Sequence, residues 1–239
     1  MIRLPVRRVV LFLALLVLAL IALFPMRIML GAMGLGSAGL SVREVRGSIW
    51  SARLAEARFG SAELGDMKAR LNLFPLLVGR ARIDLDRAET GGSSSLKGAV
   101  SVTRHSIGVD DVTARLPVAR LFAPMPVAAL DLSDVSIRFR QGACDRADGL
   151  VRAEIQGDVP GLALANGLSG TARCDGDAVL LPLASQSGME RLSLRIGKSG
   201  GYTADFVVRG ADPATSRALE ANGFAASADG LKLSVAGTL

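Results

Sequence analysis

An uncharged apolar run, Val9–Met26, is preceded by Arg3, Arg7 and Arg8 and followed by Arg27. As a helix it would be about 27 Å long, close to the hydrocarbon thickness of a bilayer. Positive charge is retained on the cytoplasmic side of a membrane. The sequence therefore predicts a single-pass anchor in a bacterial inner membrane, with a cytoplasmic N-terminus and the bulk of the chain in the periplasm.

A removed secretory signal peptide is the alternative, because Ser37-Ala38-Gly39 resembles the small residues of a cleavage site. However, the apolar region of a signal peptide usually has about 7–15 residues, and the small residues lie well beyond Arg27. An uncleaved anchor is therefore favoured. We expect residues 1–27 to form a cytoplasmic tip and transmembrane anchor, residues 28–41 a juxtamembrane segment with a short helix, and residues 42–239 a periplasmic β-rich domain.

From Val42 onward apolar and polar residues alternate, which is the pattern of strands with one buried face. Ala81, Ile83 and Leu85, for example, alternate with arginines and aspartates. The same period occurs at Met67–Leu73, Val135–Phe139, Leu192–Ile196, Tyr202–Val208 and Leu231–Val235. These runs predict a mainly β fold, a curved antiparallel sheet or sandwich-like domain of about ten strands.

Glycine-containing dipeptides between these runs predict hairpin turns. One short C-terminal helix is predicted, with Asp212 as N-cap, Pro213 in the first turn and Gly223 as the stop. Residues 116–130 contain three prolines and are predicted to be a connection or an edge, not a central strand. Residues 91–95 are predicted to be a flexible loop. The hairpin dipeptides are Asp148-Gly149, Asp175-Gly176, Gly200-Gly201 and Asp229-Gly230.

The net charge of +6 comes mostly from the anchor and its flanks. Without the four arginines around the apolar run, 24 basic and 22 acidic residues remain. These charges are interspersed, form no Lys/Arg cluster and accompany few aromatic residues. Nucleic acid is therefore not an expected partner.

Cys144 and Cys174 are the only cysteines, and both lie on the periplasmic side of the predicted anchor. Neither belongs to a CxxC or histidine-containing metal pattern. An oxidising compartment favours a disulfide, which would close a loop of about 30 residues. The alternative is a pair of reduced, buried cysteines.

Patterns that could carry chemistry are weak in this sequence. The GxGxxG match at Gly34–Gly39 lacks the preceding strand and following helix of a nucleotide site, so a juxtamembrane linker is favoured. His105 is the only histidine and is interpreted as a surface residue. The acidic pairs are interpreted as solvated strand faces or turns rather than metal ligands or acid–base pairs. We therefore expect no enzyme, no metal and no cofactor. The acidic pairs are Asp84/Asp86, Asp110/Asp111 and Asp175/Asp177.

Two motifs resemble those of type II secretion system protein N. Gly47-Ser48-Ile49-Trp50-Ser51 resembles the family's G-x-[VIL]-W-[SG] signature, through Gly47 and Trp50. Residues 71–79 resemble its W-x-L-x-P-x-x-L-x-G element through Leu73, Pro75, Leu77 and Gly79, with Leu71 in place of the frequent tryptophan. Cys144, Cys174 and Gly200-Gly201-Tyr202 resemble the family's paired-cysteine C-terminal half.

This resemblance implies a non-enzymatic, accessory inner-membrane component that contacts other secretion-system proteins in the periplasm. Such systems move folded proteins across the outer membrane. Only the resemblance supplies the secretion role.

A periplasmic lipid carrier of the AsmA type is the alternative, since a one-sided apolar sheet can curl into a groove for lipid. This alternative predicts a large apolar surface that other elements leave open. For Ile83, Leu85, Val135 and Ile137 we favour a closed core over a lipid groove. For Trp50 we favour a position in the core over a contact with a partner.

Overall fold

The computed structural model describes residues 6–32, 34, 36, 40–59, 62–87, 95–156 and 167–238. The predicted cleavage-site mimic Ser37–Gly39 and residues 91–94 of the predicted loop lie outside these ranges. The helices are α1 (Val6–Ala22), α2 (Met26–Ala32), α3 (Leu73–Leu76) and α4 (Pro213–Ala221). The strands are β1 (Leu40–Ser41), β2 (Glu44–Ser48), β3 (Ser51–Phe59), β4 (Ala62–Asn72), β5 (Ala81–Arg87), β6 (Leu96–Val102), β7 (Ser106–Pro117), β8 (Val127–Arg140), β9 (Ala143–Ile155), β10 (Leu168–Thr171), β11 (Arg173–Asp175), β12 (Ala178–Ala184), β13 (Glu190–Ile196), β14 (Gly201–Val208), β15 (Ala225–Ser227) and β16 (Gly230–Thr238).

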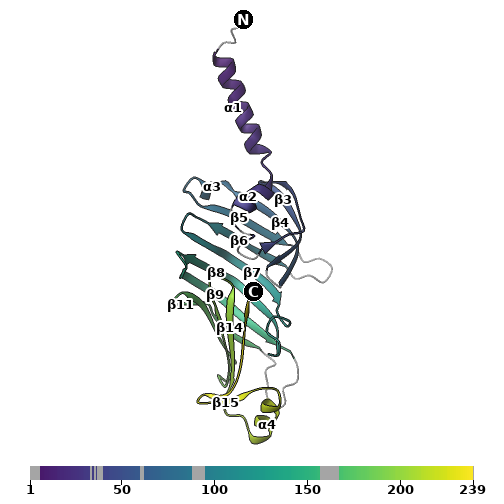
Figure 1. The fold of residues 1–239 in the computed structure, drawn as a ribbon, viewed down its shortest axis with the longest axis vertical. Coiled ribbons are helices and arrows are strands. Elements are labelled where there is room, and N and C mark those ends of the chain that lie inside the picture. The colour runs from purple at the N-terminus through teal and green to yellow at the C-terminus, as the bar shows by residue number, and fades with distance from the viewer. Residues whose placement is uncertain are drawn as a thin grey trace.

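All these strands belong to one antiparallel sheet with the order β1-β3-β4-β5-β6-β7-β8-β9-β10-β12-β13-β14-β16-β15. β2 also pairs with β3, and β11 with β12. Nearly every strand pairs with its neighbour in sequence, as in a meander. β3–β9 run obliquely across the elongated molecule, whereas β14 runs closer to its long axis (Figure 1). The prediction of a mainly antiparallel β fold is confirmed, but the described sheet has sixteen strands rather than about ten.

The prediction that residues 116–130 form a connection or an edge is wrong in part. Pro117 ends β7 and pairs with Ala129 of β8, and both strands lie inside the sheet. Only residues 118–126 connect them, and this connection lies over the core, with Phe122 2% exposed and its ring in edge contact with Tyr202 at 5.2 Å. Pro117 is the last residue of its strand, so its missing amide affects only the end of the ladder.

Three of the four predicted hairpin turns are confirmed. Asp175-Gly176 lies between β11 and β12, Gly200-Gly201 between β13 and β14, and Asp229-Gly230 between β15 and β16. Asp148-Gly149 instead lies within β9, where Gly149 has φ +107° opposite an irregular stretch of β8. A Cβ at Gly149 would lie 2.5 Å from Val135 Cα, so glycine serves the close approach of two strands there rather than a turn.

Two apolar clusters fill the fold. The larger one joins β8–β10 to β12–β14, β16 and α4, and Phe206, Leu168 and Leu219 are fully buried within it. The smaller one joins α2 to β3–β5 and contains Met26, Leu54 and Ile83. α4 has the predicted Asp212 N-cap, whose side chain accepts hydrogen bonds from the Ala214 and Thr215 amides.

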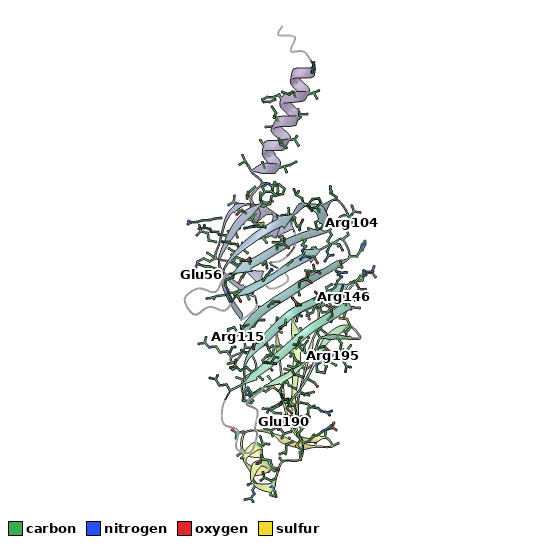
Figure 2. The ribbon with its side chains drawn as sticks, turned by 180° about the vertical axis from the view of Figure 1, so that it is seen from behind. Glu56, Arg104, Arg115, Arg146, Glu190 and Arg195 are labelled. Atoms are coloured by element: carbon green, nitrogen blue, oxygen red, sulfur yellow. A yellow bond between two sulfur atoms is a disulfide. The ribbon has the colours of Figure 1, made fainter. Side chains whose placement is uncertain are left out.

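The predicted apolar helix ends before its predicted last residue. α1 stops at Ala22, and Pro25, which lacks an amide hydrogen, makes an isolated bridge to Ser48 of β2. Met26, expected at the end of the anchor, begins α2 and is fully buried against the sheet. α1 itself projects from one end of the sheet, and its side chains point outward on all sides (Figure 2). Among the described residues, no helix has both the length and the apolar character needed to cross a membrane.

Candidate functional site at the base of the first helix

The first sequence motif forms the joint between α1 and the sheet. Ile49 and Trp50 are the two-residue connection between β2 and β3, since Ser48 pairs with Ser51. The Ile49 amide donates to the Phe24 carbonyl at 2.9 Å, and the Trp50 indole Nε1 donates to the Ile21 carbonyl at 3.3 Å. We call these contacts, with the Pro25–Ser48 bridge, the helix–sheet junction. The Ile21 carbonyl also accepts from the Phe24 amide at 3.4 Å, so Trp50 adds a second donor at the end of α1, and Ile49 bonds the chain just beyond it.

Trp50 is therefore neither a core residue nor a free docking residue. It is half-buried and packs against the smaller apolar cluster, so the predicted core position is wrong in part, and its polar edge faces α1. Indole rings commonly combine an apolar contact with one such hydrogen bond. Sequence reasoning did not anticipate the contact with Ile21, because it joins residues 29 positions apart.

The second motif begins at the same joint and forms a turn. Leu71, at the end of β4, is buried and donates its amide to the Ile49 carbonyl at 2.8 Å. Leu73, Pro75 and Leu77 then belong to the α3 turn, and Gly79 closes it with φ +74°. The structure thus brings the two motifs, about 20 residues apart in sequence, into direct contact through Ile49 and Leu71.

The α3 turn exposes apolar side chains. Phe74, Leu77 and Val78 are 82%, 85% and 82% exposed, and Leu73 is 53% exposed. We call Leu73–Val78 the apolar tip. Sequence reasoning used these residues only as a motif. Leu73–Val78 is a run of six uncharged residues between the N-cap residue Asn72 and Gly79, and this pattern is the signal in the sequence for a short exposed turn.

An arginine–aspartate cluster lies directly behind the apolar tip. Arg80 donates to Asp110 Oδ2 at 2.6 Å and to Ser101 Oγ at 3.1 Å. Guanidinium nitrogens of Arg82 and Arg138 lie 3.8 and 3.5 Å from Asp110. Burial raises the pKa of Asp110, but the hydrogen bonds from Ser101 and Arg80 and the charges of Arg80 and Arg82 outweigh burial, so the net pKa is lowered. The cluster joins β5, β6, β7 and β8 around one carboxylate.

We expect Asp110→Asn to lower the free energy of unfolding by about 2 kcal/mol at pH 7, because it leaves partly buried guanidinium groups without their counter-charge. A lowered pKa in the folded state means that the carboxylate stabilises above the unfolded pKa, about 4, and that this contribution is lost as pH falls through the folded pKa. Urea unfolding should therefore show the two proteins converging in stability below about pH 4.

Asp111→Asn is the matched control. The Asp111 side chain is 68% exposed and lies 3.4 Å from Arg82, so its loss should change stability by less than about 0.5 kcal/mol. Equal effects of the two substitutions would contradict a central role for Asp110.

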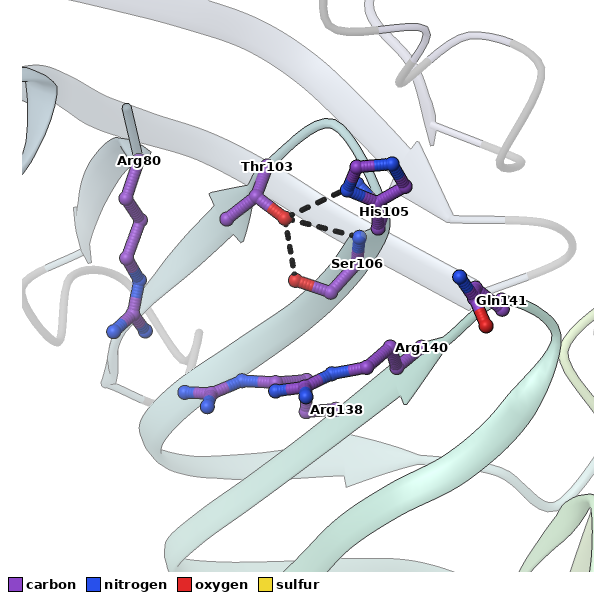
Figure 3. Close-up of a pocket in the computed structure, with 7 residues that line it drawn as sticks. All are labelled: Arg80, Thr103, His105, Ser106, Arg138, Arg140 and Gln141. Atoms are coloured by element: carbon purple, nitrogen blue, oxygen red, sulfur yellow. Dashed lines mark hydrogen bonds between the residues drawn. The ribbon is translucent and has the colours of Figure 1, made fainter. Parts of the chain in front are cut away.

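A shallow cavity of about 420 Å³ opens beside this cluster (Figure 3). Arg80 and Arg138, which line it, are held by Asp110, and Arg140 lies 3.2 Å from Asp145. His105 is exposed at its rim, as predicted, and its backbone bonds to Thr103 Oγ1 and the Gln141 amide. Because the guanidinium groups already have carboxylate partners, we interpret the cavity as a surface hollow. Its lining residues are Arg80, Thr103, His105, Ser106, Arg138, Arg140 and Gln141.

The other acidic candidates also face arginines. Asp84 lies 2.9 Å from Arg82, and Asp175 and Asp177 both pair with Arg195. In the part of the chain that the structure describes, no three His, Cys, Asp or Glu side chains are grouped so as to hold a metal ion.

The two cysteines are joined. Cys144 of β9 and Cys174 of β11 form a disulfide with a Cα–Cα distance of 5.5 Å. The predicted disulfide is confirmed, and the alternative of two reduced cysteines is wrong for this structure. The bond attaches β11, a short strand beside the main path of the sheet, to β9.

The sheet faces give little support to the lipid-groove alternative. Beyond Val9–Phe24, Ile28 and the apolar tip, the large apolar side chains exposed among the described residues are Leu150 and Met189. Ile83 and Val135 are 1% and 2% exposed. The alternating stripes therefore pack mainly into the two clusters.

A comparison with known proteins adds the biological context. The family model described as type II secretion system (T2SS), protein N, matches residues 38–234. No curated protein and no solved structure is significantly similar to the chain. The matched range contains both motifs, both cysteines and most of the sheet. The chain therefore belongs to the type II secretion system protein N family, an accessory family of that secretion pathway.

Proposed function

We propose that this chain is a non-enzymatic, accessory inner-membrane component of a type II secretion system. In this proposal it supports the export of folded proteins across the outer membrane by contacting other secretion components in the periplasm. The family match over residues 38–234 is the observation that carries the pathway. The proposal treats the sheet as a binding scaffold without catalytic function.

Attachment to the inner membrane through α1 and its flanks is part of this proposal. Every described apolar side chain from Val9 to Leu23 is exposed, which is costly in water and favourable in lipid. Arg3, Arg7 and Arg8 precede the run, and the positive-inside rule would keep them in the cytoplasm. The helix–sheet junction then holds the sheet directly below the periplasmic surface of the membrane.

A partner strand could add to the sheet at β16. β15 covers only Gly230–Lys232 of this strand, and the other side of Leu233–Thr238 has no paired strand among the described residues. Ser227 and Gly230 pair across a two-residue turn, so the backbone groups of Gly230 point toward β15. Along a strand the backbone groups of successive residues point to opposite sides, so those of every second residue after Gly230 also point away from β14. Ser234 and Ala236 therefore present outward-facing amide and carbonyl groups, as β-augmentation requires.

Ala236→Pro tests this mode of contact. Ala236 is exposed, and proline there removes an outward-facing amide while keeping the bonds of Gly237 and Val235 to β14. We expect normal membrane-fraction levels but at least about a tenfold loss of partner capture, because an unpaired donor and a clash oppose strand addition. The measurement is photocrosslinking in intact cells from a probe at Ser234.

Ala236→Thr is the control, because it keeps the amide and favours a strand. Unchanged crosslinking in the proline variant would contradict strand addition at β16. Crosslinks only to proteins outside the secretion system would contradict the proposed partners.

A further inference from the structure

Among the described residues, nothing covers the apolar side chains of the tip. Its most exposed side chains, Phe74, Leu77 and Val78, are each more than four-fifths exposed. No charged residue occurs between Leu71 and Gly79. An exposed apolar cluster of this kind indicates a contact with another apolar surface.

Several backbone groups of the apolar tip are bonded within the turn itself. Asn72 Oδ1 accepts from the Phe74 amide at 3.3 Å. The amides of Leu77, Val78, Gly79 and Arg80 donate to carbonyls of Phe74, Pro75 and Leu76 at 2.9–3.2 Å. Arg80 also fixes the base of the turn through its bond to Asp110. These internal bonds lower the cost of bringing the turn toward a low-dielectric layer, and the side chains that it exposes are apolar.

The position of the tip relative to α1 identifies the contacting surface. The tip and α1 lie at the same end of the molecule (Figure 1). Two backbone bonds link the strand before the tip to the chain just after α1, from Leu71 to Ile49 at 2.8 Å and from Ile49 to Phe24 at 2.9 Å. Ile28 on α2 is also 49% exposed, next to the exposed Arg27. Apolar side chains with neighbouring arginines are typical of a surface that meets lipid headgroups.

We infer that the apolar tip inserts into the headgroup–acyl boundary of the bilayer leaflet from which α1 emerges. This inference rests on the proposed attachment through α1 and adds a second membrane contact. A single helix can rotate about its own axis and tilt in the bilayer, and the sheet attached to it moves with it. A second contact at the tip fixes one orientation of the sheet on the membrane, and with it the direction in which the β16 edge faces secretion partners.

The test uses the full chain reconstituted into vesicles of phosphatidylethanolamine and phosphatidylglycerol. Leu77→Cys is labelled with an NBD fluorophore under non-reducing conditions, which leaves the Cys144–Cys174 disulfide unlabelled. Ala221→Cys is the matched control, because Ala221 is exposed on α4 at the opposite end of the molecule (Figure 1). Flotation of the vesicles measures attachment, and quenching by doxyl-labelled lipid measures insertion of the probe.

We expect both proteins to float with the vesicles, and doxyl lipid to reduce the emission of the Leu77 probe about twofold while leaving the Ala221 probe unchanged. Iodide in the buffer should quench the Ala221 probe more strongly than the Leu77 probe. Flotation without quenching at Leu77 would overturn the tip contact but leave the attachment through α1 intact. Failure to float would overturn both.

A second variant guards against an effect of the label. Phe74→Ser with Leu77→Ser should leave the thermal unfolding temperature unchanged, since both side chains are exposed. It should also make the α3 turn cleavable by added protease in vesicles, where the parent turn is protected. Equal cleavage of parent and variant would overturn the inference.

Discussion

Replacing Cys144 and Cys174 together with alanine is expected to lower the free energy of unfolding by about 3–4 kcal/mol on the chain-entropy model. The disulfide closes a loop with a sequence separation of 30 residues, so its loss enlarges the unfolded ensemble. β11 pairs with β12 over only three residues, and without the bond to β9 this strand should also open locally. Guanidinium unfolding of the full chain in detergent, with and without the substitutions, measures the effect.

Reduction of the unsubstituted chain provides the control, because it breaks the bond without removing the partly buried Cys144 side chain. The reduced chain and the double variant should unfold at similar denaturant concentrations. Thiol labelling of both cysteines in the unreduced, denatured protein would contradict the bond, as would a reduced protein of unchanged stability.

Gly47→Ala should destabilise the fold by about 3 kcal/mol, because a positive φ and a steric clash coincide at this motif residue. Gly47 has φ +107°, and a Cβ there would lie 2.3 Å from the Ser51 carbonyl oxygen. Ser51 flanks the turn that holds Ile49 against Phe24, so the helix–sheet junction should open first. Trp50, the only tryptophan, reports this opening as a red shift of its emission.

Gly79→Ala separates strain from clash. Gly79 has φ +74°, but nothing lies within 4 Å of an added Cβ, so the expected cost is only about 1 kcal/mol of backbone strain. Comparable losses at the two motif glycines, or an unchanged Trp50 spectrum in Gly47→Ala, would contradict the geometry of the junction.

The sequence was most informative where local physics decides the structure. Period-two stripes such as Leu192–Ile196 and Tyr202–Val208 do form strands with buried faces, and Asp212 does cap α4. The local pattern wrongly predicted a turn at Asp148-Gly149. Glycine is required there because Gly149 approaches Val135 on the neighbouring strand closely. It also missed short strands such as β11 and β15, whose three residues are too few to show a period.

The residues of the candidate site could be predicted from the sequence, but the contact between its two motifs could not. The two motifs were identified as sequence patterns, yet their contact depends on backbone bonds from Ile49 to Phe24 and from Leu71 to Ile49. Every residue except proline carries the same backbone donor and acceptor, so sequence carries no direct signal for such long-range bonds. The apolar run of the first helix was likewise evident, but the sequence predicts one continuous run to Met26, because Met26 is as apolar as its predecessors, whereas α1 ends at Ala22.

An in-frame deletion of the gene, followed by fractionation of exoproteins, tests the secretion role most directly. The type II pathway takes up substrates that have already folded in the periplasm, so the deletion should leave their entry into the periplasm normal and reduce their release into the medium. Complementation with the unaltered gene should restore release. Normal release together with a loss of outer-membrane lipid asymmetry or detergent resistance would contradict the secretion role and support a lipid carrier instead.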